Sequence, residues 1–234
     1  MNEARLIRRA AADFIGTAFL TVGIIGSGIA ASRLSHGDPG STLVANALAT
    51  GLVLVAIILA LGSVSGGELN PAVTLVAWMT GGLSRSEALT YALAQLGGAI
   101  LGAVAANVMF GLGAFSVAAQ SRSGWELWTS EVVATFGLVL VIFGLVRSGR
   151  LTAVLFAVGA YIAAAILFTS STAFANPAAT VARSLTDTFA GIAPRSVPMF
   201  VIAEFAGAAL GLAALRMLFP SIESRTRRDT DDES

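Results

Sequence analysis

The sequence Asn-Pro-Ala occurs twice in this chain, as Asn70-Pro71-Ala72 and as Asn176-Pro177-Ala178, and both copies follow long uncharged stretches. Asn is a preferred N-cap residue, and Pro at the first helical position gives up an N–H that has no intrahelical partner there. The motif therefore predicts a helix that begins inside an apolar segment. One such start in each half of the chain predicts two half-helices that meet near the middle of a bilayer.

The remaining segments are apolar enough to cross a membrane, since 56% of the 234 residues are hydrophobic and 12% are charged. A span needs about 20 residues, so the uncharged run 151–182 is too long for a single crossing. Irregular backbone is tolerated at this depth only where protein or water satisfies it. We predict an all-α integral membrane protein with two re-entrant half-helices and six spans, at residues 10–32, 41–62, 88–110, 127–146, 151–170 and 197–218.

The basic residues are distributed unevenly between the predicted loops. All fourteen are Arg, and only Arg33, Arg122 and Arg195 fall in the loops opposite the termini. The positive-inside rule then places both termini in the cytoplasm of a multi-pass protein of the inner (plasma) membrane. The formal net charge is zero, so no nucleic acid partner is predicted.

The residue types argue against an enzyme. The chain has no Cys, and its one His, His36, lies in a polar loop. The predicted spans contain no His pair, Ser-Lys pair or paired Asp, which are common arrangements for catalysis or metal binding. We predict no catalytic residue, no metal site and no cofactor.

Two intramembrane acids, Asp13 and Glu131, occupy matching positions on the first span of each half. Such acids are often functional, and in a proton-coupled transporter they could be coupling sites. We favour a bracing role, in which both accept backbone N–H bonds from the re-entrant loops, because no chain of relay partners is visible. Gln95 and Glu204 form a second matching pair and are expected to contact helices or loops.

Paired glycines also repeat, as Gly98-xxx-Gly102 and Gly207-xxx-Gly211, each on the third span of its half. Small residues at this spacing let helices approach closely in lipid. Three spans per repeat is an odd number, so the second repeat must be inverted relative to the first. We predict one domain over residues 1–220, with repeats at about 10–116 and 127–219, followed by a disordered cytoplasmic tail at 221–234.

The segment 65–74 and the second Asn-Pro-Ala resemble the aquaporin, or major intrinsic protein, family over residues 13–219. The resemblance implies a homotetramer in the lipid bilayer, with one pore per subunit that passively conducts water or small neutral solutes. In such a pore the positive N-termini of both half-helices face the centre, and Asn70 and Asn176 each aim an amide N–H at a solute oxygen. We expect both Asn residues to be caps and pore donors at once, rather than caps alone.

The family also has an outer selectivity filter, and its four positions correspond here to Thr50, Ala164, Ala173 and Ala179. Ordinary water channels have Arg at the last position, so this filter is expected to be wide, apolar and uncharged. Arg183 lies one turn further along the helix, about 6 Å nearer the outer vestibule. Two alternatives stay open: Arg183 reaches back toward Ala179, or it pairs with Asp187 or with loop carbonyls.

A filter without Arg resembles a bacterial subgroup of aquaglyceroporins that is associated with arsenic-resistance operons. This implies a channel for water, glycerol-like solutes, metalloid hydroxides and methylated arsenic acids, selected by size and charge because no Cys can bind arsenic. Glu68 stands where the family usually has His, in the cytoplasmic half of the pore. We favour a role for Glu68 in bracing its loop over a role in pH sensitivity. The alternatives for the whole protein are a strict water channel and a proton-coupled secondary transporter.

Overall fold

The computed structural model describes residues 3–219, which fold into eight α-helices and two short 3₁₀ helices. Six of the α-helices are long and apolar enough to cross a membrane, which confirms the predicted fold class. The predicted tail at 221–234 lies outside the described residues. The six long helices are α1 (Glu3–Leu34), α2 (Pro39–Ser65), α4 (Arg85–Met109), α5 (Trp125–Arg147), α6 (Leu151–Phe168) and α8 (Val197–Leu218).

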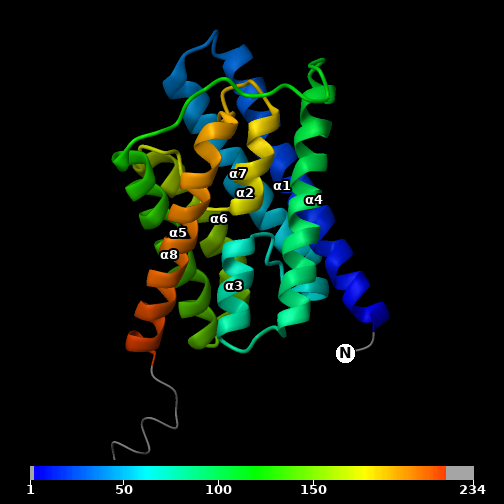
Figure 1. The fold of residues 1–234 in the computed structure, drawn as a ribbon, viewed down its shortest axis with the longest axis vertical. Helices are drawn as coiled ribbons and strands as arrows, with labels where there is room; N and C mark the ends of the chain where they lie inside the picture. The colour runs from blue at the N-terminus through cyan, green and yellow to red at the C-terminus, as the bar shows by residue number, and fades with distance from the viewer. Residues whose placement is uncertain (1–2, 220–234) are drawn as a thin grey trace, which may run out of the picture.

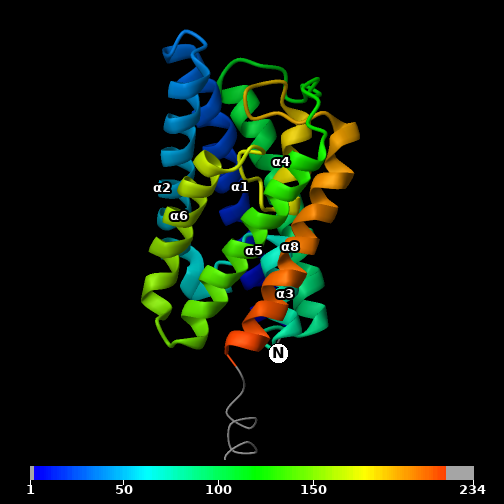
Figure 2. The same cartoon turned by 90° about the vertical axis from the view of Figure 1, so that its left-hand side faces the viewer.

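The two remaining α-helices are short and begin at the two Asn-Pro-Ala motifs. They are α3 (Pro71–Met79) and α7 (Pro177–Ala182), and α7 runs on into the 3₁₀ helix η1 (Arg183–Leu185). Figure 1 shows α3 in the lower half of the bundle and α7 in the upper half. Their first turns lie near the middle of the molecule, and α1 begins at the same end of the bundle where α8 ends (Figures 1 and 2).

Glycines allow close helix contacts between α1 and α4 and between α5 and α8. A Cβ atom added at Gly98 or Gly102 would meet the backbone carbonyl of Phe14 or Ala18 in α1. A Cβ atom at Gly207 would likewise meet the carbonyl of Val132 in α5. The glycine pairs therefore let helices from the same repeat pack backbone against backbone, and they do so in both halves of the chain.

Gly102→Val is expected to destabilise the fold by about 1–3 kcal/mol, the usual cost of overpacking. The new side chain would push into Ala18 and Thr21, and backbone atoms cannot move aside cheaply. The fraction of protein that stays monodisperse in detergent after graded heating measures the effect. Gly40→Val is the matched control, because Gly40 is exposed and the atom nearest its added Cβ is a side-chain oxygen of Asp38 at 3.6 Å. Equal melting of the two variants would contradict the packing argument.

An extended segment from about residue 110 to 124 crosses the upper end of the bundle and joins the two repeats (Figure 1). The Ser116 and Ala118 N–H groups donate to the carbonyls of Leu185 and Ser184, and the Ala193 N–H donates to the Gln120 carbonyl. The segment is thereby fastened to the loop that follows α7. This contact positions side chains from residues 110–124 beside the second half-helix.

Candidate functional site

A cavity of about 810 Å³ lies within the bundle and takes its wall from both repeats. One end is lined by Asn46 and Arg183, and we call this end the outer mouth; Thr80, Gly82 and Arg147 line the other end. Between the ends, the helical wall is almost wholly aliphatic. It is made by Leu20, Ile24, Leu54, Ile58, Leu138, Ile142, Leu155, Val158, Ile162 and Ile166.

The two motif asparagines cap their half-helices as predicted. The Oδ1 atom of Asn70 accepts a hydrogen bond from the Ala72 N–H at 2.9 Å. The Oδ1 atom of Asn176 accepts from the N–H groups of Ala178 and Ala179 at 3.1 and 3.3 Å. Each proline follows its Asn at the first helical position, where it removes a donor that the helix cannot use.

The amide groups of the same two asparagines join the two repeats. The Asn70 Nδ2 donates to the Ala175 carbonyl at 2.7 Å, and the Asn176 Nδ2 donates to the Leu69 carbonyl at 2.9 Å. Leu69 and Ala175 have φ angles of 53° and 47°, a left-handed conformation that is costly for residues with a Cβ atom. We call these two hydrogen bonds the inter-repeat tie.

The tie leaves part of each amide available to a solute. An NH₂ group has two donor hydrogens, and the structure records one acceptor for each Nδ2 atom. Asn70 and Asn176 both line the cavity. Donation to a solute stays a prediction, and the sequence did not reveal that one hydrogen of each amide joins the two repeats.

Asp13 lies beside the first re-entrant loop and is fully buried. Its Oδ2 atom accepts hydrogen bonds from the Leu69 N–H at 3.3 Å and from the Gln95 Nε2 at 2.6 Å. The same Gln95 nitrogen also donates to the Thr74 hydroxyl in α3. Asp13 and Gln95 thus contact both the loop and the half-helix that follows it.

Glu131 and Glu204 make the corresponding contacts in the second repeat, and both are fully buried. Glu131 accepts from the N–H groups of Phe174 and Ala175 at 2.9 and 2.7 Å. Glu204 accepts from the Asn176 N–H and from the Thr180 hydroxyl, which matches Thr74. Carboxylates that accept backbone N–H bonds hold a loop in place, which is the geometry of a brace.

The structure separates the four residues expected at the outer filter. Thr50 and Ala173 line the cavity, and the Thr50 hydroxyl has no hydrogen-bond partner within residues 3–219. Ala164 is exposed on the outer face of α6 and is absent from the cavity wall. The expectation for Ala164 is corrected by the helix period, because positions 162 and 166 face the cavity and position 164 lies on the opposite side.

Ala179 is buried but is not among the residues that line the cavity, whereas Arg183 is. The Arg183 Nε donates to the Ala190 carbonyl at 2.5 Å, and its Cζ atom lies 3.3 Å from the centroid of the Phe174 ring. Asp187 accepts from the Ala119 N–H instead. Of the alternatives considered, Arg183 takes the one with a loop carbonyl, and its guanidinium makes the cavity wall charged rather than uncharged.

Glu68 lines the cavity between α2 and α3. It makes no hydrogen bond within residues 3–219, and its Oε2 atom is buried without a partner. This does not match the expectation that Glu68 braces its loop.

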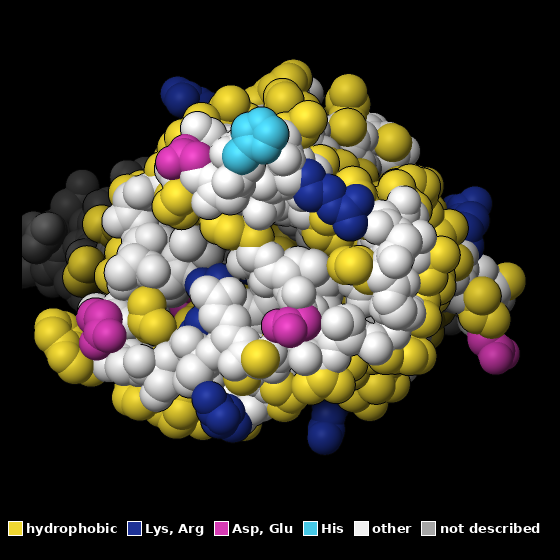
Figure 3. All heavy atoms as spheres, turned by 90° about the horizontal axis from the view of Figure 1, so that it is seen from above, with side chains coloured by type: hydrophobic (Ala, Val, Ile, Leu, Met, Phe, Trp, Pro, Cys, Tyr) yellow, Lys and Arg dark blue, Asp and Glu magenta, His cyan; other side chains and the backbone are white. Residues whose placement is uncertain are grey.

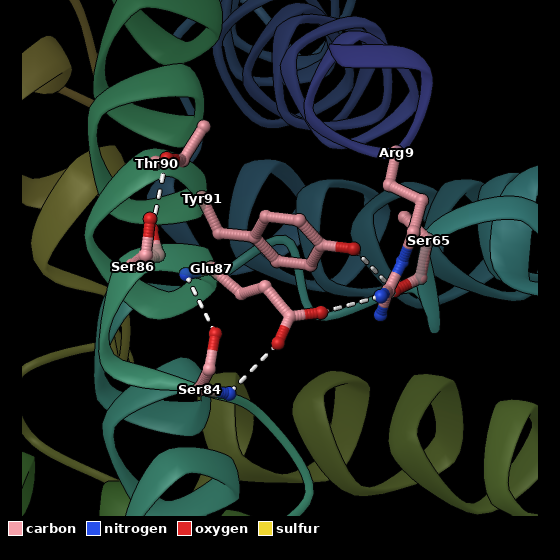
Figure 4. A network of polar contacts seen from close by, with 7 residues as sticks. All are labelled: Arg9, Ser65, Ser84, Ser86, Glu87, Thr90 and Tyr91. Atoms are coloured by element: carbon pink, nitrogen blue, oxygen red, sulfur yellow. Dashed lines mark hydrogen bonds and ion pairs between the residues drawn. The ribbon is translucent and has the colours of Figure 1, made fainter. Parts of the chain in front are cut away.

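The hydrogen bonds at this end of the bundle are made by neighbouring residues (Figure 4). The Tyr91 hydroxyl donates to the Ser65 carbonyl at 3.0 Å, and Arg9 pairs with Glu87 at 2.7 Å. Glu87 also accepts from the Ser84 N–H in the capping box that begins α4. This network joins the starts of α1 and α4 to the end of α2.

Four residues at or beside the site were not predicted from the sequence: Ile162, Ile166, Phe174 and Arg122. The first two belong to a stripe on α6 at four-residue spacing, with Val158, that a helical projection of 151–168 would have revealed. Phe174 and Arg122 gave no local signal, because their contact spans two loops that are distant in sequence.

The comparisons with known proteins agree with this architecture. A family model described as Major intrinsic protein matches residues 1–152. The chain is 46% identical over 218 residues to aquaglyceroporin AqpS of Rhizobium meliloti (strain 1021), with 93% of each chain covered. It is 32% identical over 215 residues to aquaporin NIP1-4 of Oryza sativa subsp. japonica, with 88% of this chain and 75% of that protein covered.

A solved structure supports the fold. The X-ray structure of the aquaglyceroporin from Plasmodium falciparum matches 90% of this chain and 95% of that chain with a TM-score of 0.69. The sequence identity in this comparison is 20%. The likeness therefore concerns the arrangement of the helices and not the side chains that line the cavity.

Proposed function

The chain belongs to the major intrinsic protein family, and from this premise we propose that its cavity is the conduction path of a passive channel. The protein is a channel for water and small neutral solutes such as glycerol, and it is not an enzyme. The observation that carries the proposal is the pair Asn70 and Asn176, which line the middle of the cavity where the surrounding helical wall is mostly aliphatic. A neutral solute can exchange hydrogen bonds with these donors, whereas an ion would lose its hydration shell without replacement.

We extend the proposal to larger neutral solutes, including metalloid hydroxides and methylated arsenic acids. The support is the outer part of the cavity, where Thr50 and Ala173 are small and the α6 wall is made by Ile162 and Ile166. None of these side chains carries a charge, and the described part of the cavity wall contains no His. Among neutral solutes, selection there is by size and by the hydrogen bonds that a solute can offer, while the nearby Arg183 guanidinium disfavours cations.

We also propose a homotetramer in the inner membrane with both termini in the cytoplasm. The unequal distribution of Arg residues supports this orientation. Large apolar side chains cover the outside of the long helices, which suits contact with lipid or with neighbouring subunits. Examples with more than half of their surface exposed are Leu48, Leu52, Leu93, Phe156 and Met217.

Thr50→Phe is expected to lower glycerol permeability by about tenfold or more, since a barrier increase of only about 1.4 kcal/mol has this effect. The larger Phe ring would narrow the cavity beside residue 50. Loss of the Thr50 hydroxyl would break no hydrogen bond within the described residues. Stopped-flow light scattering of proteoliposomes measures water efflux under sucrose and re-swelling under glycerol. Water permeability should fall much less than glycerol permeability.

Leu52→Phe is the matched control, because Leu52 lies two residues away on the same helix with 69% of its surface exposed. It should leave both fluxes unchanged. If the unmodified protein passes water but no glycerol, the protein is a strict water channel. If glycerol flux saturates and follows an imposed pH gradient, the channel proposal fails and a coupled transporter takes its place.

A further inference from the structure

Arg183 is the cationic group of the outer mouth, and two contacts fix its orientation. The guanidinium carbon lies 3.3 Å from the centroid of the Phe174 ring, and the Nε donates to the Ala190 carbonyl. The side chain is only 5% exposed, yet it lines the cavity. Figure 3 looks down on this end of the molecule and shows Arg side-chain atoms, in dark blue, at the base of a central recess.

The terminal N–H groups of Arg183 have no recorded hydrogen-bond acceptor within residues 3–219. A guanidinium has five N–H donors, and the structure records an acceptor only for the Nε of Arg183 within residues 3–219. No carboxylate of the described residues pairs with it within 4.0 Å, and the ion pair recorded within residues 3–219, Arg9 with Glu87, lies at the opposite end of the bundle. A charged side chain that is buried, unpaired and directed into a cavity is unfavourable unless a ligand or water completes it.

Arg122 lies against the same ring, and in contrast to Arg183 its guanidinium donates to several acceptors. Its guanidinium carbon is 5.2 Å from the Phe174 centroid. Its Nε donates to the Gly191 carbonyl at 2.9 Å, and its Nη2 donates to the Phe189 carbonyl and the Gln120 side chain. Burial lowers the pKa of Arg122 to about 10, so it remains charged at neutral pH. Arg122 fastens the loops and adds positive charge beside Arg183.

Two acids lie near these arginines but are already engaged. Glu131 accepts two backbone N–H bonds, and Glu204 accepts from the Asn176 N–H and the Thr180 hydroxyl. They lower the net charge of the region at long range without using the Arg183 donors. The terminal N–H groups of Arg183 therefore lack an acceptor. A group with two oxygens suits the planar fork of a guanidinium.

We propose that Arg183 binds the anionic group of a monoanionic oxyacid, such as a carboxylate or a phosphonate, at the outer mouth. This inference rests on the proposed channel function. The bound anion occupies the entrance and competes with neutral solutes. It does not pass, because the aliphatic wall and the two Asn amides beyond Arg183 cannot replace the hydration of an anion.

The test uses methylphosphonate as the probe, at a pH where it is a monoanion, with sodium chloride at the same ionic strength as the reference. We expect methylphosphonate to inhibit glycerol flux through the full-length protein in liposomes. In Arg183→Leu the half-inhibitory concentration should rise at least tenfold, since a hydrogen bond to a charged group contributes about 1.5–3 kcal/mol. Arg183→Lys, which keeps the charge without the fork, should lie between the two.

Arg195→Leu is the matched control, because it removes the same charge from an exposed position on the loop that precedes α8. Inhibition should persist in this variant. Absence of inhibition in the unmodified protein, equal inhibition in Arg183→Leu, or equal loss in Arg195→Leu would each overturn the proposal. Titration calorimetry of methylphosphonate into the purified protein tests binding without flux, so a protein that binds the anion but passes no glycerol would sink only the channel function.

Discussion

Glu131→Gln is expected to remove most of the folded protein from the membrane. The Glu131 carboxylate is fully buried and accepts the N–H groups of Phe174 and Ala175 through separate oxygens. Gln offers one oxygen, so its NH₂ group would face a backbone N–H that has no other acceptor. A hydrogen bond to a charged group contributes about 1.5–3 kcal/mol, a large part of the roughly 5–15 kcal/mol that stabilises a typical protein.

Fluorescence-detected size exclusion and melting in detergent measure this loss, and solute flux per reconstituted protein should fall with it. Glu126→Gln makes the same chemical change on the same helix at an exposed position, and it should melt like the unmodified protein. A Glu131→Gln protein that folds and conducts normally would show that the loop does not depend on the carboxylate. The bracing role would then have to be abandoned.

Asn176→Asp is expected to preserve the fold better and to abolish selective conduction. The carboxylate can still accept from the Ala178 and Ala179 N–H groups and so cap α7. It cannot donate to the Leu69 carbonyl, and the two oxygens would repel each other. Glycerol permeability should fall at least about tenfold, because a lost donor and an unpaired acceptor cost about 1–3 kcal/mol. Sodium leak should rise, because a negative charge at the centre attracts cations.

The control for this variant is Asn107→Asp. The Asn107 amide also donates to backbone carbonyls, those of Ala114 and Leu185, but Asn107 is not among the residues that line the cavity. Asn107→Asp should lower stability without admitting sodium. Stopped-flow glycerol flux and a sodium-sensitive dye in the same liposomes separate the two effects. Unchanged glycerol flux in Asn176→Asp would remove the central donors from the mechanism.

The sequence predicted those parts of the fold that depend on local chemistry. Asn and Pro at 70–71 and 176–177 specify helix starts wherever they occur, because capping uses atoms two or three residues away. The six spans follow from hydropathy, and their predicted bounds lie within about seven residues of the observed helices. The role of the matching acids Asp13 and Glu131 could be predicted because each repeat contains a re-entrant loop whose backbone N–H groups need an acceptor.

The side chains at the outer mouth could not be predicted in the same way. The expectation for Ala164 came from the family resemblance and motif spacing, which do not determine which face of α6 turns inward. The stacking of Arg183 on Phe174 depends on left-handed backbone at Thr172, Ala173 and Ala175. Such conformations are unusual for residues other than glycine, and the local sequence does not predict them.

The inter-repeat tie determines when the centre of the protein can form during synthesis. The acceptor of the Asn70 amide is Ala175, which follows it by 105 residues. At about 5–20 residues per second, the ribosome reaches Ala175 only about 5–20 seconds after Asn70. During that interval Asn70 caps the first half-helix, but the acceptor for its amide has not yet been synthesised. The inter-repeat tie is therefore absent while the first repeat is alone. Closure of the central barrier is therefore a late event that awaits the second Asn-Pro-Ala.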